Sequence, residues 1–153
     1  MDDKQKIIFL DIDGVLNTPK NMMDAIEKGI FPKGNIPMQT VSKDCVRRLR
    51  NIVEITDAKI VISSTWRMTM NAVWRAFAWC GWDNPPIIGK TGVGNSRGME
   101  IEDWLKKHPV KNFVIIDDDD SDIHQKEHLV QTQNEIGLTD EDCQLAINIL
   151  QSA

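Results

Sequence analysis

The sequence has few cysteines, no long apolar run and no surplus of positive charge. Its three cysteines are far apart and form no C-x-x-C pair, so we expect reduced thiols rather than a disulfide framework. The longest apolar run near the start, Ile7 to Leu10, is too short for a signal peptide or a membrane span, which favours a cytoplasmic protein with no membrane partner. A net charge of −5 disfavours a protein that coats nucleic acid non-specifically, although it leaves room for a local basic groove.

The size and composition of the chain are those of one ordinary globular domain. A length of 153 residues allows a single buried core and is too short for two, and 41% apolar with 27% charged residues is typical of a soluble protein. No repeat, low-complexity stretch or Ser/Gly linker divides it. We therefore expect one domain over residues 1–153.

Apolar runs alternate with segments of helical periodicity along the chain. Strands are predicted at 6–11, 59–63, 87–88, 112–117 and 128–130, and helices after Ser42, from Met70 to near Gly81, around 101–105, and after a Thr139–Asp142 capping box. This alternation predicts an α/β fold with three layers, a Rossmann-like parallel sheet covered by helices on both faces. Such sheets place their sites at the carboxyl ends of the strands, where Asp11, Ser63 and Asp117 occur.

The segment 9–17, which reads FLDIDGVLN, contains the strongest chemical signal. Residues two apart on an extended chain point the same way, so Asp11 and Asp13 can share one small space. Gly14 allows a sharp backbone turn directly after them. Two carboxylates that lie this close raise each other's pKa unless a cation intervenes, so the pair favours a divalent metal. A strand end with two solvated acids is the plainer interpretation of such a pair taken alone.

This first motif resembles that of the haloacid-dehalogenase (HAD) superfamily. Later motifs follow in the same order: IVISS, which ends at Ser64, and FVIIDD, which ends at Asp118. The segments SSTWR (63–67), RGMEI (97–101) and GLT (137–139) resemble one branch, the HAD domain of Swiss Army knife RNA-repair proteins. The resemblance covers about residues 6–150.

The resemblance implies a phosphoric monoester hydrolase with defined roles for the motif residues. Asp11 would attack phosphorus and form an aspartyl-phosphate, and Asp13 would protonate the leaving oxygen and later activate water. By the same resemblance, an Asp at position 13 is typical of the phosphatases of this superfamily rather than of its dehalogenases. Ser63 would bind a phosphoryl oxygen through its hydroxyl and the adjacent backbone N–H. Ser64, Arg67 and Gly14 are the expected substrate-binding positions.

Two basic residues compete for the position that neutralises the phosphoryl group. Arg97 precedes the acidic strand in an Arg-Gly pair like that of the branch, and Lys90 occurs at a spacing seen in other superfamily members. Arg97 is preferred because a guanidinium adds bidentate geometry. Arg67, close behind Ser63, is expected to contact a substrate phosphate or a carboxylate of the site, with a surface arginine as the alternative.

By the same resemblance, Asp117 and Asp118 would hold Mg²⁺ together with the Asp11 carboxylate and the Asp13 carbonyl. Mg²⁺ prefers oxygen ligands and retains waters beside a substrate phosphate. A run of acids is otherwise read as a solvated charge block. No role is assigned to three further acids in and after the run: Asp119, Asp120 and Asp122.

The polar stretch 17–40, to which we assign no helix or strand, is too short for a large cap and predicts a small flap over a nearly capless site. Open sites suit phosphates on macromolecules, so a nucleic-acid end is one expected substrate, and Lys20, Lys28 and Lys33 give the flap a slight positive excess. The alternatives are a small-metabolite or nucleotide phosphatase, a receiver-like signalling domain, and a non-catalytic phosphate- or metal-binding module. Motif order disfavours a receiver, because the acid cluster follows the candidate basic residues. The intact Asp11 and Asp13 disfavour a decayed enzyme.

Overall fold

The computed structural model describes residues 4–27 and 41–152. Its centre is a five-stranded sheet with the order β3-β2-β1-β4-β5, and every neighbouring pair is parallel. The strands are β1 (Gln5–Leu10), β2 (Lys59–Ile62), β3 (Ile87–Lys90), β4 (Val110–Asp117) and β5 (Leu129–Gln131). The predicted α/β class and parallel sheet are confirmed.

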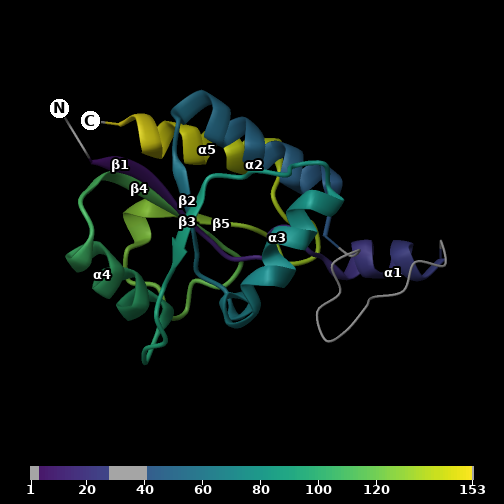
Figure 1. The fold of residues 1–153 in the computed structure, drawn as a ribbon, viewed down its shortest axis with the longest axis horizontal. Helices are drawn as coiled ribbons and strands as arrows, with labels where there is room; N and C mark the ends of the chain where they lie inside the picture. Colours follow the sequence, from purple (N-terminus) through teal and green to yellow (C-terminus); the bar gives the residue numbers. More distant parts are fainter. Residues whose placement is uncertain (1–3, 28–40, 153) are drawn as a thin grey trace.

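Helices cover both faces of this sheet (Figure 1). Helices α2 (Lys43–Thr56), α3 (Met70–Trp79) and α5 (Asp140–Gln151) pack on one face, and α4 (Arg97–Lys107) packs on the other. Helix α1 (Pro19–Glu27) lies to the side, beyond α3 (Figure 1). Two short 3-10 turns, η2 (Thr65–Thr69) and η3 (Lys126–His128), follow β2 and precede β5. No helix of the described residues has an apolar stretch long enough to cross a bilayer.

Side chains of β1 alternate between two separate apolar clusters. Ile8 and Leu10 lie in the larger cluster with α2, α3 and α5, whereas Ile7 and Phe9 lie in the smaller cluster under α4. All four are almost fully buried. A strand buried on both faces is continuously apolar, which is why this run in the sequence identifies the central strand.

The predicted helix boundaries are set by the capping residues that the sequence indicates. The Ser42 hydroxyl accepts from the Cys45 N–H, and Thr139 and Asp142 form a reciprocal capping box at the start of α5. All three cysteines are free thiols, as expected.

Two local expectations need correction. The segment after the first motif contains a helix, α1, which begins after Thr18, whose hydroxyl accepts from the Asn21 N–H. Residues 28–40 of the expected flap, with Lys28 and Lys33, lie outside the described residues. Strand β5 begins at Leu129 rather than at His128, which belongs to η3.

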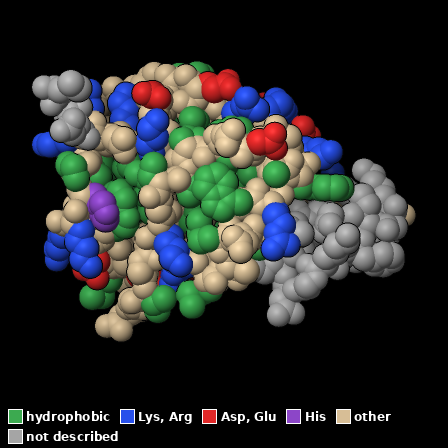
Figure 2. Space-filling view, viewed as in Figure 1, with side chains coloured by type: hydrophobic (Ala, Val, Ile, Leu, Met, Phe, Trp, Pro, Cys, Tyr) green, Lys and Arg blue, Asp and Glu red, His purple; other side chains and the backbone are tan. Residues whose placement is uncertain are grey.

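The surface shown in Figure 2 carries Lys and Arg side chains dispersed among apolar and acidic ones. Among the described side chains on this face they form no continuous basic track.

Candidate active site

The acidic motifs meet at the carboxyl edge of the sheet. Strands β1 and β4 are paired with Leu10 opposite Ile116, so Asp11 and Asp117 leave the sheet side by side. Carboxylate oxygens of Asp11, Asp117 and Asp118 lie within 4.8 Å of one another. They line a pocket of about 280 Å³. The residues around this acid pocket are Asp11, Asp13, Thr65, Arg97, Asp117, Asp118, Asp119 and Asp122.

Gly14 lies against Asp118, one of the residues that line this pocket. Its φ is +81°, in the left-handed region, and a Cβ built there would collide with the Asp118 carboxylate and lie 2.9 Å from Asn134 Nδ2. The Asn134 amide donates to Asp118 Oδ2 at 3.1 Å. Gly14 therefore allows the loop after β1 to approach Asp118, and contact with substrate is not needed to explain it.

Burial makes the acid pocket costly to ionise. Asp11 is 8% exposed and Asp117 is 4% exposed. Burial first, and then the charge of Asp117, raise the pKa of Asp11 to about 9, although Arg97 opposes this shift. Burial also raises the pKa of Asp117 to about 6, against a backbone hydrogen bond from Asp119 and the charge of Arg97. Two adjacent carboxyl groups with raised pKa values in one pocket favour the binding of a further positive charge there.

The donor set fits a hard divalent cation. The three clustered side chains offer only oxygen, and a cation between them would offset the burial and the repulsion from Asp117 that together raise the pKa of Asp11. One Asp117 oxygen already accepts from the Asp119 N–H at 3.0 Å, and Asn134 holds one oxygen of Asp118. These hydrogen bonds fix the orientation of two carboxylates, as surrounding residues do around protein metal sites.

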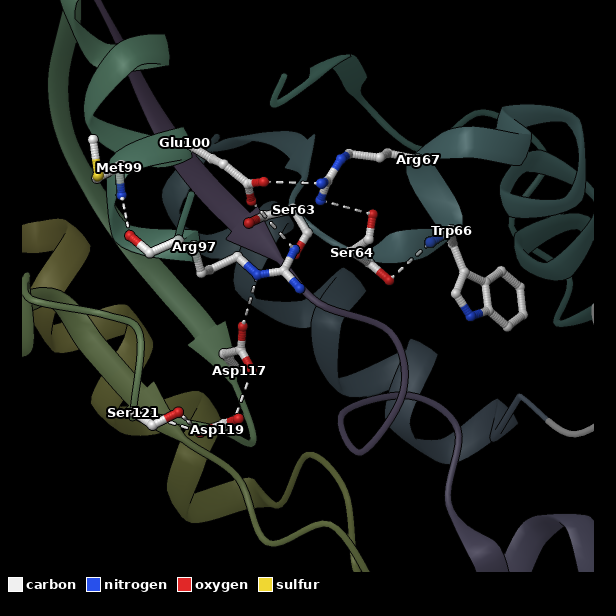
Figure 3. A network of polar contacts seen from close by, with 11 residues as sticks. Ser63, Ser64, Trp66, Arg67, Arg97, Met99, Glu100, Asp117, Asp119 and Ser121 are labelled. Atoms are coloured by element: carbon white, nitrogen blue, oxygen red, sulfur yellow. Dashed lines mark hydrogen bonds and ion pairs between the residues drawn. The ribbon is translucent and has the colours of Figure 1, made fainter. Parts of the chain in front are cut away.

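Of the two candidate basic residues, Arg97 lies in the acid pocket and Lys90 lines a different cavity. Arg97 opens α4, its Nε is 3.7 Å from Asp117 Oδ2, and its Nη1 donates to the Ser63 carbonyl (Figure 3). Lys90 Nζ donates to the Arg67 carbonyl at 3.0 Å and borders a cavity of about 420 Å³ beside Trp104. The geometry thus brings Arg97 to the clustered acids.

The two serines after β2 have different surroundings. Ser63 is 1% exposed, and its hydroxyl has no hydrogen-bond partner within the described part of the chain. A buried hydroxyl without a partner is costly and is therefore available to a bound ligand. The Ser64 hydroxyl instead accepts from the Trp66 N–H at 3.2 Å and caps η2 (Figure 3).

Arg67 is buried behind the acid pocket rather than lining it. It is 7% exposed, its Nη2 donates to Glu100 Oε2 at 2.9 Å, and its Nη1 donates to the Ser64 carbonyl at 3.3 Å (Figure 3). Glu100 also accepts from the Gly94 N–H and lies 4.0 Å from Arg97. The carboxylate that Arg67 contacts is therefore Glu100, which connects it to Arg97.

Two residues outside the predicted site residues hold Asp13 in place. Trp66 Nε1 and Asn17 Nδ2 both donate to Asp13 Oδ1, at 3.1 and 3.2 Å. Asn17 is four residues from Asp13 and closes the same motif, but Trp66 is 53 residues away. The only hint in the sequence is that a buried tryptophan needs an acceptor for its indole N–H.

A parallel α/β sheet with an acid-lined site at its carboxyl edge has the architecture of a HAD superfamily domain. The chain belongs to the family described as the HAD domain in Swiss Army Knife RNA repair proteins, whose model matches residues 7–143. No curated protein and no solved structure matches the sequence significantly. Membership of a HAD family indicates phosphatase-type chemistry.

Proposed function

We propose that this protein is a Mg²⁺-dependent phosphatase that hydrolyses phosphomonoesters through an aspartyl-phosphate on Asp11. The observation that carries this proposal is the convergence of Asp11, Asp117 and Asp118 beside Arg97 in one small pocket. Asp11, Asp117 and Asp118 would hold Mg²⁺, which would neutralise the clustered charge and favour the ionised form of Asp11.

The reaction has two steps that balance at phosphorus. In the first, an Asp11 oxygen forms a bond to phosphorus, the bond to the leaving oxygen breaks, and that oxygen takes a proton from Asp13. In the second, water attacks the aspartyl-phosphate and gives a proton to Asp13, which releases inorganic phosphate and restores the Asp11 carboxylate. Arg97 and the free Ser63 hydroxyl would bind phosphoryl oxygens during both steps.

For the substrate class we propose a phosphorylated nucleic-acid end. The support is the family's description as a domain of RNA-repair proteins and the expectation of a nearly capless site, which suits a phosphate on a macromolecule. The pocket itself carries six carboxylates and one guanidinium, so we expect contacts to the rest of a polyanionic substrate to lie outside it.

The test is phosphate release by wild type and Asp11→Asn, each with Mg²⁺ and with EDTA. The panel comprises p-nitrophenyl phosphate, free nucleotides, and oligonucleotides with a 5′- or 3′-phosphate. We expect release that requires Mg²⁺ and falls by at least about 10³-fold in Asp11→Asn, because the nucleophile is lost. Turnover retained by Asp11→Asn would contradict the proposal, and a preference for free nucleotides would support the small-metabolite alternative.

The same assay assigns the basic group. Arg97→Ala should lower turnover by about 10²-fold or more, as loss of a transition-state donor does. Lys90→Ala is the matched control, because it removes an equal charge from a side chain that lies outside the acid pocket. A larger effect of Lys90→Ala would reverse the assignment.

A further inference from the structure

We propose that Trp66 and Asn17 are positioning residues that fix Asp13 so that its Oδ2 is the oxygen that exchanges protons with the leaving group and with water. The inference rests on the proposed function, since it assigns a task to groups around the general acid. The two oxygens of the Asp13 carboxylate differ, because both side-chain donors bind the same one, Oδ1. Within the described residues, Asp13 Oδ2 has no hydrogen bond.

Asp13 needs such support because of where it lies. Unlike Asp11, Asp13 is exposed and lies beyond the end of β1, so the sheet does not restrict its side chain. A general acid must lie within about 2.6–3.2 Å of the oxygen that it protonates, and a displacement of about 1 Å can cost about 10²-fold in rate. Two hydrogen bonds to Oδ1 restrict both side-chain torsions at once.

Both donors are themselves held rigidly. Trp66 is 4% exposed and packs in the larger apolar cluster, and its backbone N–H donates to the Ser64 hydroxyl. The Asn17 N–H donates to the Ile12 carbonyl at 3.1 Å, and the Asn17 carbonyl accepts from the Gly14 N–H at 2.7 Å. The apolar core therefore fixes Trp66, and the first motif fixes Asn17; we call these two donors the Asp13 clamp.

The Asp13 clamp also gives Ser64 a physical role, through its hydrogen bond to Trp66. Its hydroxyl caps η2 through the Trp66 N–H, so it orients the residue that in turn holds Asp13. Ser64 would then act through Trp66 and need not touch substrate.

The orientation of the Asn17 amide follows from the same contact. Asp13 Oδ1 is an acceptor, so only the amide nitrogen of Asn17 can face it favourably. The opposite atom, Asn17 Oδ1, is buried and without a hydrogen-bond partner in the described part of the chain. The contact between the amide N–H and Asp13 therefore leaves the amide oxygen unpaired, which costs free energy.

The leaving group distinguishes positioning from a merely structural role. A p-nitrophenolate departs readily as an anion, whereas an alkoxide must be protonated as it leaves. The measurement compares kcat/KM for p-nitrophenyl phosphate with kcat/KM for a nucleoside 5′-monophosphate, which is an alkyl phosphate ester. Trp66→Phe, which keeps the ring and removes the donor, should lower kcat/KM for the alkyl ester at least tenfold more than for the aryl ester.

Asn17→Ala should show the same selective loss, and the double variant a larger one. Asn17→Ala also keeps the test decisive if Trp66→Phe does not fold. The matched control is Trp82→Phe, because Trp82 is also buried but packs edge-to-face on Phe77, away from the acid pocket. Equal losses for both esters in the Trp66 and Asn17 variants would overturn the proposal.

A second measurement needs no turnover. In ¹H–¹⁵N spectra of the metal-free protein, the indole N–H of Trp66, assigned with Trp66→Phe, should move in Asp13→Ala, while the Trp82 indole stays in place. An unmoved Trp66 signal would overturn the contact. A wild type that hydrolyses no member of the panel would instead count against the proposed function, and the spectra would still decide whether the indole holds Asp13.

Discussion

At the scale of single residues, two glycines separate backbone strain from crowding of the acid pocket. Gly14 and Gly81 both have left-handed backbones, with φ of +81° and +87°. A Cβ on Gly14 would meet Asp118 and Asn134, whereas nothing lies within 4 Å of a Cβ on Gly81. A side chain would therefore be strained by the left-handed backbone at both positions, and only at Gly14 would it also collide with neighbouring side chains.

Gly14→Ala should lower both stability and metal affinity. The left-handed backbone alone costs about 1–2 kcal/mol for an L-residue, and the collision with Asp118 would move one of the three clustered carboxylates. Loss of a ligand position should weaken Mg²⁺ binding by about tenfold or more, measured by calorimetric titration.

Gly81→Ala is the control for this prediction. It should lose a similar 1–2 kcal/mol in chemical denaturation, because its backbone is equally strained, and it should bind Mg²⁺ like the wild type. Equal Mg²⁺ affinities in the two variants would show that Gly14 does not set the position of Asp118.

The sequence predicts the residues of this site unevenly, for a physical reason. Asp11 and Asp117 can be predicted because each ends an apolar strand, and parallel strands bring their carboxyl ends together. The contact of Trp66 with Asp13 joins residues 53 apart and depends on how η2 packs, which no local pattern shows. Glu100 is hidden in the same way, because only the fold reveals that it is buried against Arg67.

At the scale of elements, the Arg67–Glu100 ion pair connects η2 to α4. Both side chains are less than 10% exposed, and Glu100 also approaches Arg97 at the start of α4. Removing one partner of a buried pair leaves an unpaired buried charge, which costs about 3–5 kcal/mol. Glu100→Ala should therefore destabilise the protein by about that amount in chemical denaturation.

An exposed ion pair provides the comparison. Arg50 and Glu54 form an i,i+4 contact of 3.0 Å on α2, with side chains 48% and 63% exposed. Glu54→Ala should cost about 0.5 kcal/mol or less of stability, because water screens such pairs.

A double variant, Arg67→Met with Glu100→Leu, should cost less stability than Glu100→Ala alone, because it leaves no unpaired buried charge. A Glu100→Ala cost no larger than that of Glu54→Ala would mean that this pair does not fasten η2 to α4.

At this scale the buried strands are predicted well, whereas the short helix α1 is not. The five strands were found because their apolar runs are covered on at least one face. No helix is predicted for α1 because its nine residues span too few turns for the apolar periodicity to repeat, even though its apolar residues share one face. Its start signal was nevertheless present, since Thr18 caps the helix and Pro19 occupies the first helical position.

At the scale of the whole molecule, the acid pocket links folding stability to pH. The folded pKa of Asp11, about 9, lies above the ordinary value of 3.8, so the native state binds more protons than the unfolded state between these values. The stability contributed by protonated Asp11 is fully present below pH 4 and is lost as pH rises towards 9. Asp117, with a pKa of about 6, adds a loss with the same sign over a narrower window.

Bound Mg²⁺ should reverse this trend, because it requires the deprotonated forms of the same carboxyl groups. We expect 10 mM Mg²⁺ to raise the melting temperature little at pH 5 and by several degrees at pH 8, where protons compete less. With EDTA, the melting temperature should instead fall from pH 5 to pH 8.

Asp117→Asn should abolish the Mg²⁺ effect on the melting temperature. Asp120→Asn removes the same charge from an exposed position outside the cluster and should retain the effect. An equal Mg²⁺ effect at both pH values would mean that the cation binds elsewhere on this acidic protein. Only a site that displaces protons from Asp11 and Asp117 makes the effect of Mg²⁺ on the melting temperature depend on pH.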